Sequence, residues 1–305
     1  MRADVLVLAV LCVFLLMIVP ALFPRTREAE VRVVCGANLG QIGKAMLVYA
    51  EDYDGALPRT GGPSTAWGAP YNWMAPDRYS AFGLSRADES GGRASISSCF
   101  YMLVKYMEMP TRGFVCEGDE GTTEFKRSEL TAIPSDFELT DVWSFGPCHE
   151  ATEHCSYTYH MPYGLYPLTT SRDPNLAVAA DRSPWIKSPA AEPCAWSFFR
   201  PDIPPYCGSA EEARAGNAVS HQNDGQNVLF LDGRVNFELR SYCGATSADA
   251  PGAFADAPDN IYTISAICDA GDPYGTAPPG PQFVPANEYD SVLVHDPPDF
   301  GGGRR

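Results

Sequence analysis

Apolar and polar residues in the first part of the chain recur with the period of one long helix. Residues 5–23 carry no charge over 19 positions, about the length that crosses a bilayer at ~1.5 Å per residue. After Arg25, apolar residues recur at steps of three and four, at Val31, Val34, Cys35, Leu39, Ile42, Met46 and Tyr49. This spacing places them on one helix face, and Gly55 and Pro58 end the pattern. We therefore expect one helix over residues 4–54, with its first half in lipid and its second half on a globular domain.

The uncharged segment is also compatible with a cleaved signal peptide. Val19 and Ala21 are small enough to precede a cleavage site. We favour a retained membrane segment, because the apolar face continues in phase into the following helix and a cleaved peptide would not require this continuity. The expected location is the cytoplasmic membrane, as a single-pass protein whose globular domain lies outside the cytoplasm, in the periplasm or at the cell surface.

Short apolar runs after this helix predict strands. The candidates are residues 112–116, 156–161, 175–181, 227–231 and 234–239. A second helix is predicted over 94–109, where Pro110 closes an apolar pattern of helical spacing. Strands in runs, without alternating helices, predict an α+β fold in which the long transmembrane and amphipathic helix packs on an antiparallel β-sheet.

Composition changes along the chain and suggests four parts. They are an N-terminal membrane segment at 1–25, an amphipathic stalk helix at 26–54, a globular domain at 55–243, and a Pro-, Gly- and Asp-rich extension at 244–305. Glycine and proline are abundant at 27 each, which predicts a loop-rich domain with short elements.

The stretch "HQNDGQNVLFLDGRVNFEL", residues 221–239, has the pattern of a β-hairpin. Its Asp-Gly pair between apolar runs is typical of a tight turn. Most simply, its polar residues are structural: they form the turn, end a strand and pack over the sheet. A calcium site is the first alternative, because hard cations prefer carboxylate and amide oxygens; its ligands would be Asp181, Asp224, Asn227 and Asp232. A catalytic role is the second, with His221 as a general base oriented by Asp232 or Asp181.

Two carboxylates from neighbouring strand ends would need neutralisation if Asp181 and Asp232 lie close together. Arg182 and Arg234 stand directly beside them in the sequence. We expect a guanidinium to supply at least part of this neutralisation, so that calcium would be optional.

Charge and cysteine content restrict the class of protein. A formal net charge of −16 repels phosphate backbones and argues against nucleic acid as a partner. Ten cysteines point to an oxidising compartment. The order of cysteines along the chain offers three local disulfide pairings: Cys148 with Cys155, Cys194 with Cys207, and Cys243 with Cys268. "CHEATEHC" (148–155) also holds the residue types of a zinc site, but a short disulfide loop fits its spacing better.

Several motifs together resemble the type IV pilin-like family, including the pseudopilins of type II secretion. The first is "VPALFPRTREAEVRVVCGANLGQIGKAMLVYAEDYDGALP", a proline late in an apolar helix followed by Cys-x-x-Asn-Leu-x-x-Ile. The others are "FVCEGDE", "SYTYHMPYG", "NLAVAADRSPW", the hairpin and "DNIYT", in this order over most of 15–263. The chain departs from the family in two features: "MRADVLVLAVL" holds no Gly-Phe prepilin cleavage motif, and Arg234 stands where the family hairpin commonly has His.

The resemblance implies a pilin-like fold and a bacterial cell-envelope function. We expect a membrane-anchored structural subunit of a filament or secretion-type assembly, acting by helix–helix association and not as an enzyme. Its partners would be copies of itself or other pilin-like subunits, together with membrane lipid through residues 5–23; Gly36, Gly40 and Gly43 would let neighbouring helices approach closely. No cofactor is expected beyond the optional calcium. The alternative is a periplasmic hydrolase or carbohydrate-binding protein that uses His221 and Asp232.

Overall fold

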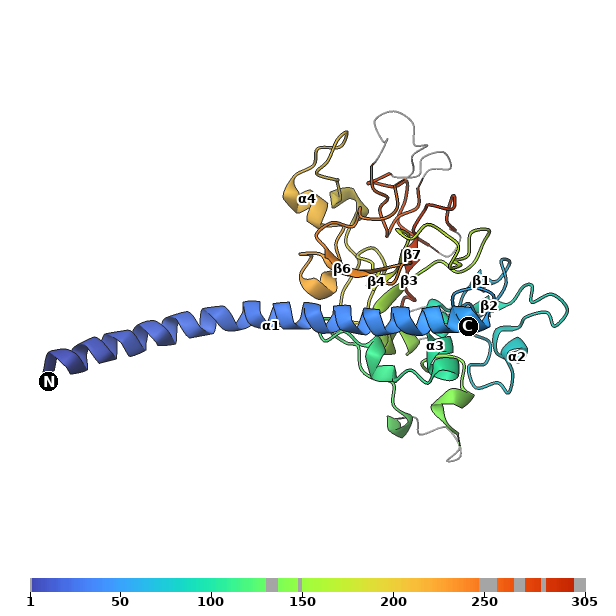
Figure 1. Ribbon diagram of the computed structural model, residues 1–305, viewed down its shortest axis with the longest axis horizontal. Coiled ribbons are helices and arrows are strands. Elements are labelled where there is room, and N and C mark those ends of the chain that lie inside the picture. Colours follow the sequence, from blue (N-terminus) through green and yellow to red (C-terminus); the bar gives the residue numbers. More distant parts are fainter. Residues whose placement is uncertain are drawn as a thin grey trace.

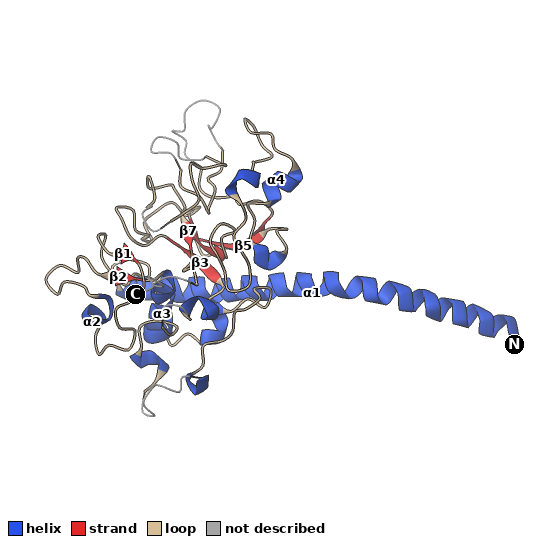
Figure 2. Cartoon of the chain, turned by 180° about the vertical axis from the view of Figure 1, so that it is seen from behind, coloured by secondary structure: helices blue, strands red, loops and turns tan. Residues whose placement is uncertain are grey.

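The computed structural model describes residues 2–129, 137–147, 150–246, 257–265, 272–280 and 284–298. Helix α1, Arg2–Asp52, is the longest element. Its C-terminal half lies against the globular part of the chain, and its N-terminal half projects away from it (Figures 1 and 2).

A five-stranded antiparallel sheet forms the centre of the globular part, with strand order β6-β5-β4-β3-β7. The strands are β3 Tyr157–His160, β4 Ala177–Asp181, β5 Gln226–Phe230, β6 Val235–Glu238 and β7 Leu293–Val294. Strands β5 and β6 form the hairpin, in register with Leu229 opposite Val235. A separate pair, β1 Ala66–Trp67 and β2 Arg93–Ala94, is parallel.

The remaining elements are short helices. The α-helices are α2 Arg78–Phe82, α3 Ile96–Met107 and α4 Ala210–Arg214. The 3-10 helices are η1 Thr111–Phe114, η2 Arg127–Glu129, η3 Leu139–Asp141, η4 Ala151–His154, η5 Trp196–Phe198 and η6 Val219–His221. Ser95 caps α3 by accepting a hydrogen bond from the backbone N–H of Ser98. The apolar face of this helix packs beside α1.

The sheet is covered on both faces because successive side chains of a strand point to opposite sides. On one side, Leu229 and Val178 pack with the buried face of α1 and with α3. On the other, Val228 and Phe230 join an aromatic cluster of loop residues built around Trp185, Phe199 and Tyr262. The helix layer therefore packs on one face of the sheet and a loop layer packs on the other.

The predicted transmembrane helix is a wrong prediction. In the part of the chain that the structure describes, none of the helices is both long enough and apolar enough to pass through a membrane. The span was predicted at residues 5–23; the following stretch of α1, residues 27–52, packs on the sheet and carries seven charged side chains: Arg27, Glu28, Glu30, Arg32, Lys44, Glu51 and Asp52. The predicted fold class is therefore wrong in its transmembrane helix. The predicted single-pass membrane location depended on that helix and is wrong with it.

The predicted strand at 112–116 is also wrong, because this segment forms the 3-10 helix η1. Thr111 and Gly113 adopt a tight turn after Pro110, and Thr111 Oγ1 donates a hydrogen bond to the carbonyl of Phe125. The turn places Phe114 in the core and directs Cys116 toward α1. The contacts of Thr111 with Phe125 and of Phe114 with the core outweigh the local strand pattern.

The three glycines of α1 face this chain's own hairpin and not a neighbouring helix. A Cβ atom added at Gly43 would lie 2.6 Å from Leu229 Cδ1, and one at Gly36 would lie 3.0 Å from Asn227 Oδ1. At Gly40 the nearest atom, Val235 Cγ2, would be 4.0 Å away. These glycines thus let β5 and β6 approach α1 closely. They were expected to contact a neighbouring helix instead.

Candidate functional site

A disulfide bond between Cys35 and Cys116 joins α1 to the loop after η1. The two Cα atoms are 5.3 Å apart and the residues are 81 positions apart in the chain. Both side chains are buried between the helix and the sheet. The bond therefore fixes the C-terminal half of α1 to the globular part of the molecule.

A buried polar cluster lies against this disulfide. Asp181, at the end of β4, accepts a hydrogen bond from the backbone N–H of Asn227, with a distance of 2.6 Å to Oδ2. The same oxygen is 3.1 Å from Nε2 of His221, which ends η6. Cys116 Sγ lies 3.9 Å from that imidazole nitrogen. Elements far apart in the sequence thus bring two cysteines, a carboxylate and an imidazole together.

The electrostatics of the cluster favour an ion pair. Burial acts to lower the pKa of His221, but the charge of Asp181 and its hydrogen bond act in the other direction and dominate. The pKa of His221 is therefore raised above its usual value of 6.5, and the imidazolium–carboxylate form is stabilised. Two buried atoms, Asp181 Oδ1 and His221 Nδ1, have no hydrogen-bond partner among the described residues.

The predicted pairing of His221 with Asp232 is not formed. These residues stand at opposite ends of β5: His221 is fully buried beside Asp181, whereas Asp232 lies in the hairpin turn and pairs with Arg234. Of the two orienting carboxylates considered from the sequence, Asp181 is the one in contact with the imidazole. His221 is fully buried and has no contact with solvent.

The structure brings together only two of the four predicted calcium ligands. Asp181 and Asn227 are in contact, but Asp224 pairs with Arg32 at 2.7 Å and also with Arg214. Asp232 is separated from them by the length of β5. An extended strand cannot bring residues at its two ends to one ion, and arginines already balance both outer carboxylates.

The expected neutralisation by arginine is seen at Asp232 but not at Asp181. Arg234 binds Asp232 and also stacks over the ring of Phe230 at 4.0 Å. Arg182 turns away from its neighbour Asp181 and forms a buried ion pair of 2.7 Å with Asp119.

The observed disulfide is not among the three predicted pairings. Cys194 and Cys207 are both free thiols, because Cys194 packs at the edge of the Trp185 cluster while Cys207 is exposed in a turn. The predicted pairings of Cys155 and Cys243 involve Cys148 and Cys268, which lie outside the described residues. The zinc alternative at 148–155 likewise falls partly on these positions.

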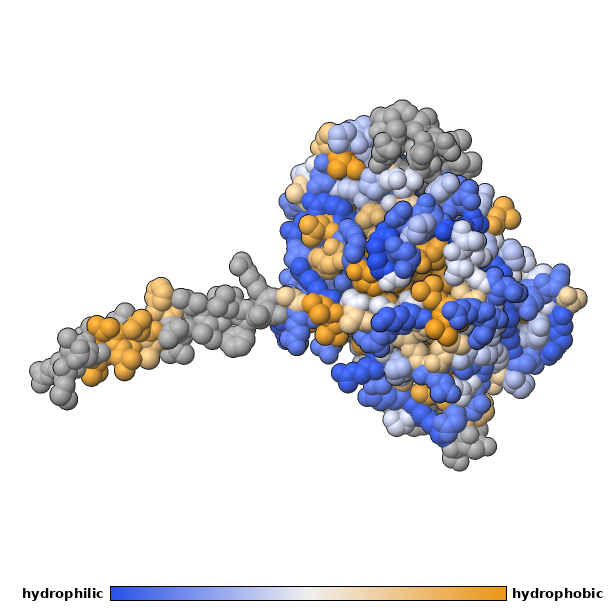
Figure 3. Space-filling view, in the orientation of Figure 1, coloured by the Kyte–Doolittle hydropathy of each residue, from blue (hydrophilic) through white to orange (hydrophobic). Residues whose placement is uncertain are grey.

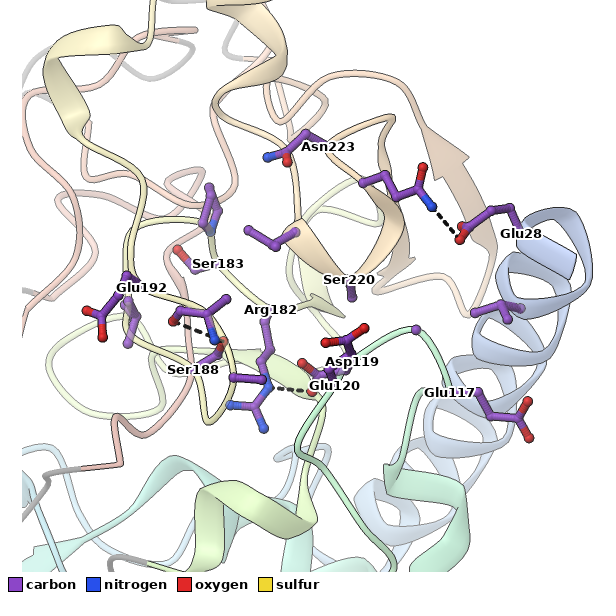
Figure 4. A pocket seen from close by; sticks show the side chains of 18 of the residues that line it. Glu28, Glu117, Asp119, Glu120, Arg182, Ser183, Ser188, Glu192, Ser220 and Asn223 are labelled. Carbon is purple, nitrogen blue, oxygen red and sulfur yellow. Dashed lines mark hydrogen bonds and ion pairs between the residues drawn. The ribbon is translucent and has the colours of Figure 1, made fainter. Parts of the chain in front are cut away.

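A pocket of about 850 Å³ opens beside the buried cluster (Figure 4). It is formed by the start of the packed part of α1, by the loop after Cys116, by the segment after β4 and by η6. Figure 4 shows the Asp119–Arg182 ion pair on its wall. Glu28 accepts a hydrogen bond from Gln222 at 2.6 Å across the pocket rim. The pocket is lined by residues directly next to Cys116 and His221, namely Glu117 and Ser220.

Sequence reasoning missed the partner of Cys35 and the grouping around it. One signal was present, since Cys35 lies on the predicted buried face of the helix and Cys116 follows an apolar run. Comparisons of the chain with protein families, with characterised proteins and with solved structures gave no match. The function must therefore be argued from the geometry.

Proposed function

We propose that this chain is a pilin-like structural subunit that works by helix–helix association with copies of itself or with related subunits. The observation that carries the proposal is the projecting half of α1, which presents apolar side chains away from the globular part (Figure 3). They include Val5, Val7, Leu8, Leu11, Val13 and Phe14, all at least half exposed.

An apolar surface of this kind requires a covering partner. Burying one Val, Leu or Phe side chain stabilises by roughly 1.5–3 kcal/mol, so these six together provide on the order of 10 kcal/mol. Association costs about 4–15 kcal/mol in lost translational and rotational freedom. A single helix pair would thus be marginal, and an assembly in which each helix contacts several neighbours would be stable.

The outer face of α1 extends this surface along the globular part. Val33, Val34, Leu47 and Val48 are exposed on the helix where its other face packs on the sheet. Since Gly36 and Gly43 already contact the hairpin, a neighbouring helix would dock on this outer, valine-rich face. The disulfide at Cys35 holds the helix in place while its outer face is presented.

The alternative function as a hydrolase or carbohydrate-binding protein has less support. It requires His221 and Asp232 in one accessible site, and these residues lie at opposite ends of β5. The cluster that His221 does join is fully buried.

Cross-linking of the native thiols tests the proposal. Cys12 is an exposed thiol on the projecting helix, and Cys207 is an exposed thiol on the globular part. Mild oxidation of the purified full chain should give disulfide-linked dimers, and these should be lost in Cys12→Ser but kept in Cys207→Ser. Phe14→Glu should reduce both the cross-link and the mass measured by light scattering.

Two results would overturn the proposal. One is a monomer at every concentration, with no cross-link through Cys12. The other is cross-linking that depends on Cys207 and is insensitive to Phe14→Glu, because this would place the contact on the globular part. Filaments or regular oligomers seen by electron microscopy would add direct support.

A further inference from the structure

We propose that reduction of the Cys35–Cys116 disulfide converts the buried cluster into a binding site for a divalent transition-metal ion of the zinc type. The ligands would be the two thiolates, the imidazole of His221 and the carboxylate of Asp181. This site shares only Asp181 with the predicted calcium ligands, and the proposal does not depend on the proposed assembly function.

The spacing of the donor atoms matches a four-coordinate site. One ligand atom from each of the four residues lies within 4.8 Å of all the others. Zinc–sulfur and zinc–nitrogen bonds of about 2.3 and 2.0 Å imply separations of roughly 3.3–3.8 Å between tetrahedral ligands. The observed separations are 3.1 Å between His221 Nε2 and Asp181 Oδ2, and 3.9 Å between Cys116 Sγ and His221 Nε2. Breaking the sulfur–sulfur bond lets the two sulfur atoms move apart to the same spacing.

The chemistry of the donor set also fits. Two thiolates, an imidazole and a carboxylate are all common zinc ligands, and the thiolates select against calcium and magnesium. With a divalent ion the site carries one net negative charge. The guanidinium of Arg32, which pairs with Asp224 and stacks over Phe237 at 4.6 Å, also acts on His221 as a positive charge and opposes part of this charge.

The surrounding residues already orient the ligands. The backbone N–H of Asn227 donates a hydrogen bond to Asp181 Oδ2 and so orients the carboxylate. Its other oxygen, Oδ1, is buried with no partner among the described residues, which gives the carboxylate a second oxygen for an ion. Ser156 Oγ accepts a hydrogen bond from the backbone N–H of Cys116. Outer contacts of this kind fix ligand orientation in metal sites. Gly36 leaves room for Asn227 against the helix.

The pocket in Figure 4 lies next to the buried cluster, although none of the four ligands lines it. Its lining includes residues adjacent in sequence to the ligands, Glu117 and Ser220, and Val31 one helical turn before Cys35. Its charged side chains are mainly carboxylates: Glu28, Glu117, Asp119, Glu120 and Glu192, against Arg27 and Arg182. A negative lining raises the local concentration of cations.

The reaction balances with a dithiol as reductant. The dithiol gives two electrons and two protons to the disulfide and becomes a cyclic disulfide, while Cys35 and Cys116 become thiols. Binding of the ion then releases both thiol protons and the Nε2 proton of His221 to solvent. The covalent link between α1 and the loop after η1 is replaced by coordination, so the helix stays attached in both redox states.

Metal titration of the full chain tests the site. The reduced chain should bind one equivalent of Zn²⁺ in competition with a chromophoric chelator, and the oxidised chain should not. Co²⁺ should give the thiolate charge-transfer bands and the visible bands of tetrahedral coordination. Cys35→Ser or Asp181→Asn should weaken Zn²⁺ binding at least about tenfold to a hundredfold. Cys99→Ser, which removes a buried free thiol elsewhere in the core, should leave it unchanged.

Thermal melting provides a second test, which applies even if reduction lowers the stability of the chain. Under reducing conditions, Zn²⁺ at about a hundred times its dissociation constant should raise the melting temperature by several degrees. The proposal is overturned if the reduced chain neither binds Zn²⁺ nor is stabilised by it. It is equally overturned if the oxidised chain or the Cys35→Ser variant binds as tightly as the reduced wild type.

Discussion

Replacing Gly43 by alanine tests how closely α1 packs on the hairpin. Alanine is the better helix former, by about 0.8–1.0 kcal/mol relative to glycine. In isolation the substitution would therefore stabilise the chain. The structure predicts the opposite sign, because the added Cβ would lie 2.6 Å from Leu229 Cδ1 and 3.2 Å from Leu229 Cδ2.

The magnitude follows from how little room Leu229 has. This side chain is 1% exposed, and the void beside it and Gly43 is only about 10 Å³. Overpacking of such a core costs about 1–3 kcal/mol. After the helix-propensity gain, Gly43→Ala should destabilise the chain by roughly 0–2 kcal/mol. Gly40→Ala, where the nearest atom is 4.0 Å from the new Cβ, should stabilise it by about 1 kcal/mol.

Equilibrium unfolding in denaturant, followed by tryptophan fluorescence with the disulfide kept oxidised, measures both variants. The difference between them isolates the packing cost, since both glycines lie inside α1 and differ mainly in their neighbours. In a Leu229→Val background the cost at Gly43 should largely disappear, giving a coupling energy of about 1–3 kcal/mol. If Gly43→Ala stabilises as much as Gly40→Ala, Leu229 does not pack against this glycine and the described contact is refuted.

Three further predictions concern the disulfide, the buried ion pair and the pH dependence of stability. Replacing Cys35 and Cys116 together by serine should lower the free energy of unfolding by about 4 kcal/mol, because the bond closes a loop spanning 81 positions; a loss below about 1 kcal/mol in denaturant unfolding would contradict this. Arg182→Met should cost about 3–5 kcal/mol by leaving Asp119 buried and unpaired, whereas the matched change Arg234→Met at the exposed pair with Asp232 should cost about 0–1 kcal/mol. Burial lowers the pKa of His160 from 6.5 to about 4, so below pH 6.5 the unfolded chain takes up a proton that the folded chain does not. The free energy of unfolding should therefore fall by on the order of 3 kcal/mol as the pH decreases from about 6.5 to about 4. The pH profile of His160→Gln in the same unfolding assay should lack this component, and identical profiles would refute the assignment.

The sequence by itself determined the long helix and the hairpin, but not the segment 112–116, which was predicted as a strand and forms a 3-10 helix. Helical spacing of apolar residues predicted a helix over 4–54, and α1 runs over Arg2–Asp52. Alternation and the Asp232–Gly233 turn predicted the hairpin of β5 and β6. These features are set by periodicity and turn chemistry within a few residues, so they can be read locally. The predicted membrane span was a local inference too, and the structure did not bear it out.

The candidate site was accessible to sequence reasoning only in part. The sequence singles out Asp181, Asn227 and His221, most simply as structural residues of the hairpin region, with a calcium site and a His221 base oriented by Asp232 or Asp181 as the alternatives. Their true grouping depends on the end of β4 lying beside the start of β5, and on η6 folding back over both. Which end of a strand a residue occupies decides its neighbours, and that is fixed by strand pairing and not by sequence order.

Only the tertiary structure decided which cysteines meet and which way the glycines face. Cys35 and Cys116 are brought together from 81 positions apart because α1 packs across the sheet at the turn after η1. Gly36 and Gly43 look like a ridge for a neighbouring helix in the sequence, yet they contact Asn227 and Leu229 of the same chain. The physical reason is common to both. The orientation of a helix is set by the packing that buries the most apolar area, and this orientation decides what its glycines and cysteines contact. The surface against which it packs forms only when distant segments of the chain come together.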